Sequence, residues 1–132
     1  MKTLGLDIGD QWTGIALSDE LGMLARPYMT IQADTLFSTL TELIEQEPIT
    51  TVVIGYPITM RGTVSEQTKK IETIKENLEQ QFPSLSFVFQ DERLTSKQAA
   101  LLKKNKTKED KLAGHARAAA FILSNYLQFT NR

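Results

Sequence analysis

The chain has 132 residues, of which 41% are hydrophobic and 23% are charged, and its formal net charge is −1 at neutral pH. These values are ordinary for a globular protein, and the length predicts one domain over residues 1–132. The absence of cysteine excludes disulfides and cysteine-ligated metal centres. No apolar run reaches the length of about 18 residues that spans a membrane, and Asp7 interrupts the apolar N-terminus. We therefore expect a cytoplasmic protein without a signal peptide or membrane contact.

Three strands are predicted at the start of the chain, over residues 3–9, 12–19 and 22–31. Short connections that contain glycine join them and favour antiparallel pairing. Pro27 lies within the third segment and makes regular pairing of that strand less favourable.

The rest of the chain alternates helices with strands. Periodic apolar residues predict helices over 35–47, 65–82 and 95–104 and a last helix within "LAGHARAAAFILSNYL" (112–127), with strands over 50–57 and 85–92. Asp34 is the expected N-cap of the first helix. Because each later strand is reached through a helix, the crossovers are expected to be parallel. This order predicts an α/β fold of the ribonuclease H-like type, with a five-stranded mixed sheet and helices on both faces.

Asp7 interrupts an otherwise apolar strand. An ionised carboxylate there is costly unless it is paired or binds a metal. Leu6 and Ile8 point to the opposite face, so Asp7 can line a cleft. The alternative is a structural aspartate that accepts hydrogen bonds from local backbone amides. Glycines at positions 5, 9 and 14 allow another segment or a ligand to approach the backbone closely.

A second acidic pair, Asp91 and Glu92, stands where a strand leaves the sheet. Adjacent strand residues face opposite ways, so one of the two is expected to share a cleft with Asp7. Arg93 can neutralise the other, and a solvated loop with an ion pair is the alternative. Two carboxylates on neighbouring strands can hold Mg²⁺ or Mn²⁺. Two such ions about 4 Å apart support phosphodiester hydrolysis.

His115 is the one histidine of the chain and is predicted in the first turn of the last helix. It shares a helix face with Ala118, Ala119 and Ile122. This spacing leaves two readings open: a third metal ligand, or a histidine packed in the core.

A run of lysines over residues 103–111 offers a local basic patch in a chain that is otherwise slightly acidic. Such a patch can bind the phosphates of a nucleic acid. A solvated loop between two helices explains the same residues. The candidates for nucleic-acid binding in this run are Lys103, Lys104 and Lys106.

Four segments of the chain resemble, in order, the motifs of the YqgF-type family: "LGLDIGDQWTGIALSD", "VVIGYPITMRGTVSEQT", "QDERLTSKQA" and "AAAFIL". Members of that family are described as Holliday junction resolvases or pre-16S rRNA nucleases. The resemblance implies a metal site with acidic residues in the first strand, in the "DER" motif and before the paired alanines of the last helix. Carried over, these positions are Asp7, Glu92 and His115.

Two residues depart from the family pattern. His115 replaces the usual aspartate, which makes it a substituted metal ligand that favours Mn²⁺ over Mg²⁺, or a general acid or base. Trp12 stands where the family has a basic residue, and it can stack on a base or fill the rim of the core. Arg61, in the "GYP…RGT" motif, matches the family and is expected to contact phosphate, with Arg93 nearby.

The resemblance implies a metal-dependent nuclease that processes the 5′ end of pre-16S rRNA, with the assembling small ribosomal subunit as a partner. One alternative is resolution of four-way DNA junctions, which the low positive charge disfavours. Another is a catalytically impaired RNA-binding assembly factor, which the changes at Trp12 and His115 favour. The first hairpin is also similar to that of actin-like ATPases and sugar kinases. Those proteins need two such lobes, and this chain is long enough for one.

Overall fold

The computed structural model describes residues 1–57, 66–92 and 108–130, with the backbone alone described for Glu92 and residues 108–111. Its centre is one five-stranded mixed sheet in the order β3-β2-β1-β4-β5. The predicted α/β fold with a five-stranded mixed sheet is confirmed. The elements are β1 (Lys2–Ile8), β2 (Trp12–Ser18), β3 (Ala25–Gln32), a 3₁₀ turn η1 (Ala33–Thr35), α1 (Leu36–Gln46), β4 (Ile49–Pro57), α2 (Glu66–Gln81), β5 (Ser86–Glu92) and α4 (Lys108–Thr130).

The sheet combines two kinds of pairing, as predicted. Strand β1 pairs antiparallel with β2, and β2 pairs antiparallel with β3. The crossovers through α1 and α2 then make β4 parallel to β1 and β5 parallel to β4. The carboxyl ends of β1, β4 and β5 therefore meet at one edge of the sheet, which is where ligands bind in open α/β folds.

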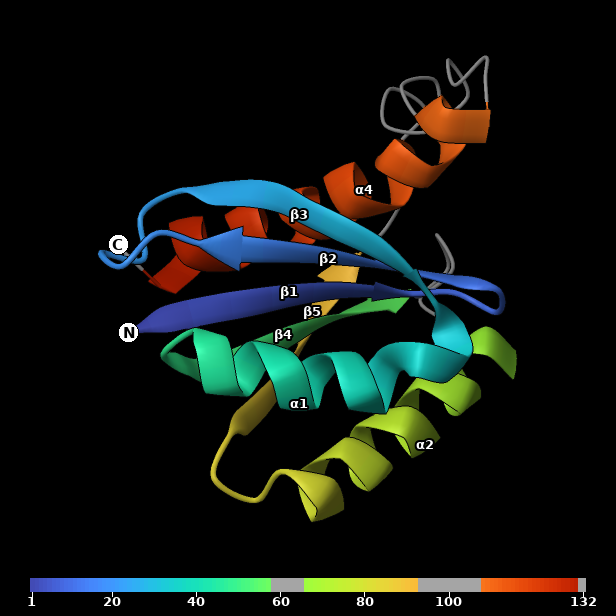
Figure 1. Ribbon diagram of the computed structural model, residues 1–132, viewed down its shortest axis with the longest axis horizontal. Helices are drawn as coiled ribbons and strands as arrows, with labels where there is room; N and C mark the ends of the chain where they lie inside the picture. Colours follow the sequence, from blue (N-terminus) through green and yellow to red (C-terminus); the bar gives the residue numbers. More distant parts are fainter. Residues whose placement is uncertain (58–65, 93–107, 131–132) are drawn as a thin grey trace.

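Helices cover both faces of the sheet (Figure 1). On one face, α1 and α2 pack over large aliphatic side chains of the strands, including Leu4, Leu6 and Ile15. On the other face, α4 packs over small residues such as Ala16 and Val53. The alternation of a strand separates these two sets, because successive side chains point to opposite faces.

The third strand begins later than predicted, at Ala25 instead of position 22. The carboxylate of Asp19 accepts hydrogen bonds from the backbone amides of Met23, at 2.8 Å, and Leu24, at 3.3 Å, and so holds the preceding residues in a turn. These bonds lower the pKa of Asp19, with the Met23 amide as the main cause. Pro27 lies in the edge strand β3 beside an irregularity in the β2–β3 register, as the sequence indicated.

The prediction of Asp34 as the N-cap of α1 is wrong. The chain makes the 3₁₀ turn η1 first, which encloses Asp34 and moves the N-cap to Thr35. The Thr35 side chain makes no cap hydrogen bond, because its hydroxyl donates to the Gln32 carbonyl at 2.7 Å.

Helix α4 begins at Lys108, four residues before the start at 112 that the sequence indicated and within the lysine run, for which a solvated loop was one of two readings. His115 therefore lies seven residues after the first residue of the helix and not in its first turn. The predicted helix 95–104 lies outside the described residues. Among the helices that the structure describes, none is long and apolar enough to cross a membrane.

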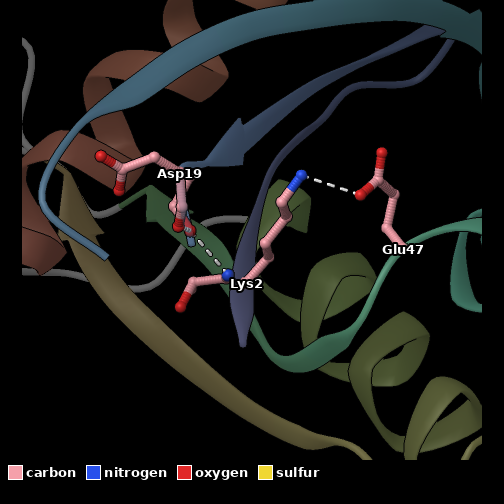
Figure 2. Close-up of polar contacts among 5 residues, drawn as sticks. Lys2, Asp19 and Glu47 are labelled. Atoms are coloured by element: carbon pink, nitrogen blue, oxygen red, sulfur yellow. Dashed lines mark hydrogen bonds and ion pairs between the residues drawn. The ribbon is translucent and has the colours of Figure 1, made fainter. Parts of the chain in front are cut away.

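The ends of the sheet differ in their chemistry. Near the N-terminus, the ammonium group of Lys2 lies 2.8 Å from a carboxylate oxygen of Glu47 (Figure 2). At the same end, the Thr3 amide donates to the Ser18 hydroxyl at 2.8 Å, beside Asp19. Polar groups at this end are paired and hold turns. The opposite end, where β1 turns into β2, carries Asp7.

Candidate active site

A row of three residues crosses the sheet at the candidate site. Asp7 on β1 is paired with Gly14 on β2, and Gly14 is paired with Thr30 on β3. Directly opposed residues of antiparallel strands point to the same face of the sheet. The row therefore belongs to the face that α4 covers.

Helix α4 lies directly against this row because Gly14 has no side chain. A Cβ atom at Gly14 would collide with the backbone carbonyl of His115. Further along the helix, a Cβ atom at Gly5 would lie 2.8 Å from the Leu123 Cβ atom. The close approach that these glycines were predicted to allow is confirmed, and α4 is the segment that approaches.

Asp7 is a half-buried carboxylate whose electrostatic surroundings include a histidine. Burial raises the pKa of Asp7, and the charge of His115 acts in the opposite direction and lowers it. Within the described residues, no backbone amide or side chain donates a hydrogen bond to the Asp7 carboxylate. The alternative of an aspartate held by local backbone amides therefore finds no support there. Leu6 and Ile8 lie in the core on the opposite face, as predicted.

Asp91 lies near the polar groups of the α2 face. The Tyr56 hydroxyl donates to a carboxylate oxygen of Glu72 at 2.8 Å. This bond is the main cause that raises the pKa of Tyr56, and the charge of Asp91 contributes. In the β4–β5 register, Asp91 is paired with Tyr56 and Glu92 with Pro57. Asp91 is thus a neighbour of Tyr56 and Glu72, on the face opposite to Asp7.

The predicted metal ligands are brought together in part. Asp7 and His115 are far apart in the sequence but close in the fold: the His115 backbone lies against Gly14, the pairing partner of Asp7, and the charge of His115 acts on the Asp7 carboxyl. Glu92 ends β5 at the carboxyl edge of the sheet, but its side chain is outside the described part of the structure. Among the described residues, no three His, Cys, Asp or Glu side chains gather into a group that could hold a metal ion.

Trp12 begins β2 and is half-buried. It lies two residues before Gly14 in the strand, so it belongs to the same face as Asp7. The other predicted contacts to nucleic acid lie outside the described residues: Arg61, Arg93, Lys103, Lys104 and Lys106.

Two polar residues of α2 that the sequence did not single out contact the strand ends near this site. The hydroxyl of Thr68, which is fully buried, donates to the Pro57 carbonyl at 2.6 Å. The side-chain amide of Gln67 donates to the Ile8 carbonyl at 3.3 Å. The sequence feature that could have identified Thr68 is its position three residues before Ile71, which places it on the apolar stripe of α2. A buried hydroxyl there requires a partner.

Residues 1–129 match the protein family described as "RuvX: Holliday junction resolvase". This chain belongs to the RuvX family. It is the YqgF-type family that the four sequence motifs indicate, and the predicted membership is confirmed.

Curated relatives support the same membership. A protein of Shouchella clausii named "Putative pre-16S rRNA nuclease" is 40% identical, with 96% of this chain and 94% of the relative covered. A protein of the same name from Carboxydothermus hydrogenoformans is 38% identical, with 100% of this chain and 99% of the relative covered. RuvX relatives therefore match this chain over almost its whole length.

Solved structures show the same fold at low sequence identity. RuvC of T. thermophilus in complex with a Holliday junction substrate has a TM-score of 0.56 and 12% identity, and 99% of this chain and 96% of RuvC are covered. The fowlpox virus resolvase in complex with substrate Holliday junction DNA has a TM-score of 0.51 and 14% identity, and both chains are covered completely. These two likenesses support the ribonuclease H-like fold of this RuvX protein.

Proposed function

We propose that this RuvX protein is a divalent-metal-dependent endonuclease that hydrolyses phosphodiester bonds near the 5′ end of pre-16S rRNA. The observation that carries the proposal is the Asp7 carboxylate, which is half-buried on the α4 face, is influenced by the charge of His115 and receives no hydrogen bond from the described residues. A carboxylate in such a place is costly unless a cation balances it. The names of the curated relatives, pre-16S rRNA nucleases, suggest the RNA substrate.

The donor set suits a hard or intermediate divalent cation. Nucleases of the resolvase and ribonuclease H-like class depend on divalent metals. Asp7 offers carboxylate oxygens and His115 an imidazole nitrogen, and we assign Glu92 as the third ligand. The reason is elimination: Asp91 neighbours Tyr56 on the α2 face, and adjacent strand residues alternate between faces. When bound, the metal supplies Lewis-acid activation of the phosphate and of the attacking water.

His115 sets the choice of ion in this proposal. An imidazole in place of a carboxylate removes one negative charge from the ligand set, and it binds Mn²⁺ better than Mg²⁺. We therefore expect higher activity with Mn²⁺ than with Mg²⁺. His115→Asp should reverse the order of the two ions.

Trp12 is the proposed contact to a nucleic-acid base, because it is half-buried on the same face as Asp7. Base stacking on an aromatic side chain contributes roughly 1–3 kcal/mol to binding. Trp12→Ala should weaken RNA binding by that amount, and Trp12→Phe should retain most of it. Equal binding by the two variants would assign Trp12 to the rim of the core. Arg61, Arg93 and the lysines 103, 104 and 106 are proposed to bind phosphates of pre-16S rRNA on the assembling small ribosomal subunit, in the cytoplasm.

Cleavage of labelled precursor rRNA, with Mg²⁺ and with Mn²⁺, tests the proposal. The variants Asp7→Asn and Glu92→Gln should reduce the cleavage rate by about 10²-fold or more, because a bound metal supplies several kcal/mol of transition-state stabilisation. Asp10→Asn is the matched control. Asp10 is an exposed carboxylate three residues from Asp7, and it pairs with Lys70 at 3.4 Å. Cleavage that persists in Asp7→Asn, or that Asp10→Asn removes equally, would contradict the proposal.

Thermal unfolding without metal shows whether Asp7→Asn is still folded. Because burial raises the pKa of Asp7, the folded state favours the protonated carboxyl, and ionisation at neutral pH opposes folding. The asparagine variant should therefore unfold at a higher temperature than the wild type at pH 7. The difference should shrink as the pH falls through the raised pKa of Asp7 toward the ordinary pKa of aspartate, about 3.9, and should have vanished below it. A more stable but inactive variant separates loss of chemistry from loss of fold.

Four-way DNA junction resolution is the second candidate, since the matched family is described as a Holliday junction resolvase. A labelled four-way junction belongs in the same assay as the precursor rRNA. Cleavage of the junction alone would select this candidate. A wild type that binds RNA without cleaving it, but cleaves once His115→Asp is introduced, would instead indicate a binding factor that has lost its chemistry.

A further inference from the structure

The position of α4 along the sheet depends on a side chain that the proposed nuclease chemistry does not use. Thr30 is the third residue of the row that begins with Asp7, and its hydroxyl donates a hydrogen bond to the backbone carbonyl of Leu112. Leu112 lies three residues before His115, within one turn of α4. One atom of β3 is thereby joined to the turn of the helix that carries the imidazole.

We propose that Thr30 is a positioning residue, which sets His115 against Asp7 through the Leu112 carbonyl. The inference rests on the proposed function, in which Asp7 and His115 bind one metal ion. Thr30 itself touches neither the metal nor the reacting phosphate in this proposal.

Two different contacts are needed to place the helix. The contact at Gly14 sets the distance between α4 and the sheet, because the His115 backbone lies against a residue without a side chain. It does not prevent α4 from sliding along its axis or rotating. A hydrogen bond to a single carbonyl restricts both movements, because the bond weakens steeply when donor and acceptor move apart or out of line.

The strand alone does not require a hydroxyl at position 30. Valine has the same branched shape and an equal or higher preference for strands. A helical carbonyl that is already bonded within α4 still has a second lone pair to accept the Thr30 hydroxyl. The hydroxyl therefore adds a link between β3 and α4 that an apolar residue of the same shape could not supply.

The chain offers a conservative variant and a matched control. Thr30→Val removes the hydroxyl and keeps the shape, and Thr30→Ser keeps the hydroxyl. Thr130 lies at the other end of α4, where its hydroxyl donates to the Tyr126 and Leu127 carbonyls at 3.2 Å. Thr130→Val therefore removes a threonine-to-carbonyl bond of the same helix, far from His115.

The first measurement is the affinity of the full chain for Mn²⁺. It is monitored through the paramagnetic broadening of the His115 imidazole NMR signals. His115 is the single histidine, so these signals need no further assignment. In Thr30→Val we expect Mn²⁺ affinity to fall about 10-fold, the lower end of the range for residues that orient a metal ligand. Thr30→Ser and Thr130→Val should bind Mn²⁺ like the wild type.

Each result bears on the inference. Wild-type Mn²⁺ affinity in Thr30→Val would overturn it. A loss in Thr30→Ser as large as in Thr30→Val would assign the effect to packing instead of the hydroxyl. An equal loss in Thr130→Val would assign it to general weakening of α4. The melting temperature of each variant shows whether it is folded. If Thr30→Val does not fold, Thr30→Ser still tests the inference, because a loss of Mn²⁺ affinity in that variant would contradict a role for the hydroxyl.

A metal-free measurement separates this inference from the proposed function. Without metal, Asp7→Asn should shift the His115 imidazole signals, because the two side chains are neighbours. In a Thr30→Val background that shift should be reduced. If the wild type neither binds Mn²⁺ nor cleaves RNA, the proposed function fails, and this comparison still decides the role of Thr30. A shift of the same size in both backgrounds would overturn the positioning role.

Discussion

The two faces of the sheet use the same strands for different purposes. On the α1 and α2 face, β1 contributes Leu4, Leu6 and Ile8 to a core of large aliphatic side chains. On the α4 face, the residues between them are Gly5 and Asp7. The large side chains exclude water and stabilise the fold. The glycines let a helix backbone come close enough to place a histidine near a half-buried carboxylate.

The comparison teaches that stability and chemistry can be separated residue by residue along one strand. Asp7 lies between two fully or nearly fully buried aliphatic residues in the sequence, yet it faces another helix. Substitutions of sequence neighbours should therefore have different consequences. Three variants test this separation.

Leu6→Ala should have the largest effect on stability. Leu6 is fully buried, and truncation of such a leucine costs about 3 kcal/mol through lost apolar burial and the cavity left behind. Chemical denaturation measures the loss, and cleavage should be normalised to the folded fraction. Activity per folded molecule should stay near that of the wild type. A specific loss of activity as large as that of Asp7→Asn would show that the two faces are not independent.

Gly14→Ala should lower the free energy of unfolding less than Leu6→Ala does, and it should lower the activity more. The added methyl group collides with the His115 backbone, and overpacking of this kind costs about 2 kcal/mol. The helix must move away from the sheet at His115, so Mn²⁺ affinity and cleavage should fall further than the folded fraction does. Gly5→Ala is the matched control, because its Cβ would lie 2.8 Å from the Leu123 Cβ atom and 2.9 Å from the Ala119 carbonyl oxygen, one to two turns after His115. Equal losses of Mn²⁺ affinity in both variants would contradict a local role for Gly14.

Thr13→Val should have the smallest effect, and it should be stabilising. Thr13 is fully buried, and among the described residues its hydroxyl oxygen makes no hydrogen bond. An unpaired buried polar group costs roughly 1–3 kcal/mol, so its removal should raise the free energy of unfolding by about 1 kcal/mol. Thr41→Val is the control, since that hydroxyl is exposed and donates to the Phe37 carbonyl at 2.9 Å. No gain, or a loss, in Thr13→Val would show that the hydroxyl is paired in solution.

Much of the fold could be predicted from local patterns. The alternation and apolar runs of the strands, and the helical spacing of the apolar residues, depend on a few neighbouring positions. The failures occurred at the first residues of helices. Asp34 has the chemistry of an N-cap, but a 3₁₀ turn moved the start of α1 beyond it. The beginning of α4 at Lys108 was missed because its first turn is rich in charged residues and lacks an apolar stripe.

The candidate site divides in the same way. The motifs alone indicated Asp7, the acidic pair at the end of β5 and His115, because a carboxylate in an apolar strand and a histidine on an apolar helix face are unusual in sequence. The assignment of Asp91 to the neighbourhood of Tyr56 required the register of β4 and β5. The contact of α4 with Gly14 and its bond to Thr30 required the path of that helix across the sheet.

The sequence by itself determined the secondary-structure order, the mixed sheet, the family and the residues worth testing, since each of these is written in local periodicity or in contiguous motifs. Only the tertiary structure decided which helix lies over Asp7, how closely it lies and which side chains hold it there. The physical reason is that these contacts join residues of β1, β2, β3 and α4 that are distant along the chain. Their distances follow from the packing of the whole sheet, which no local pattern contains.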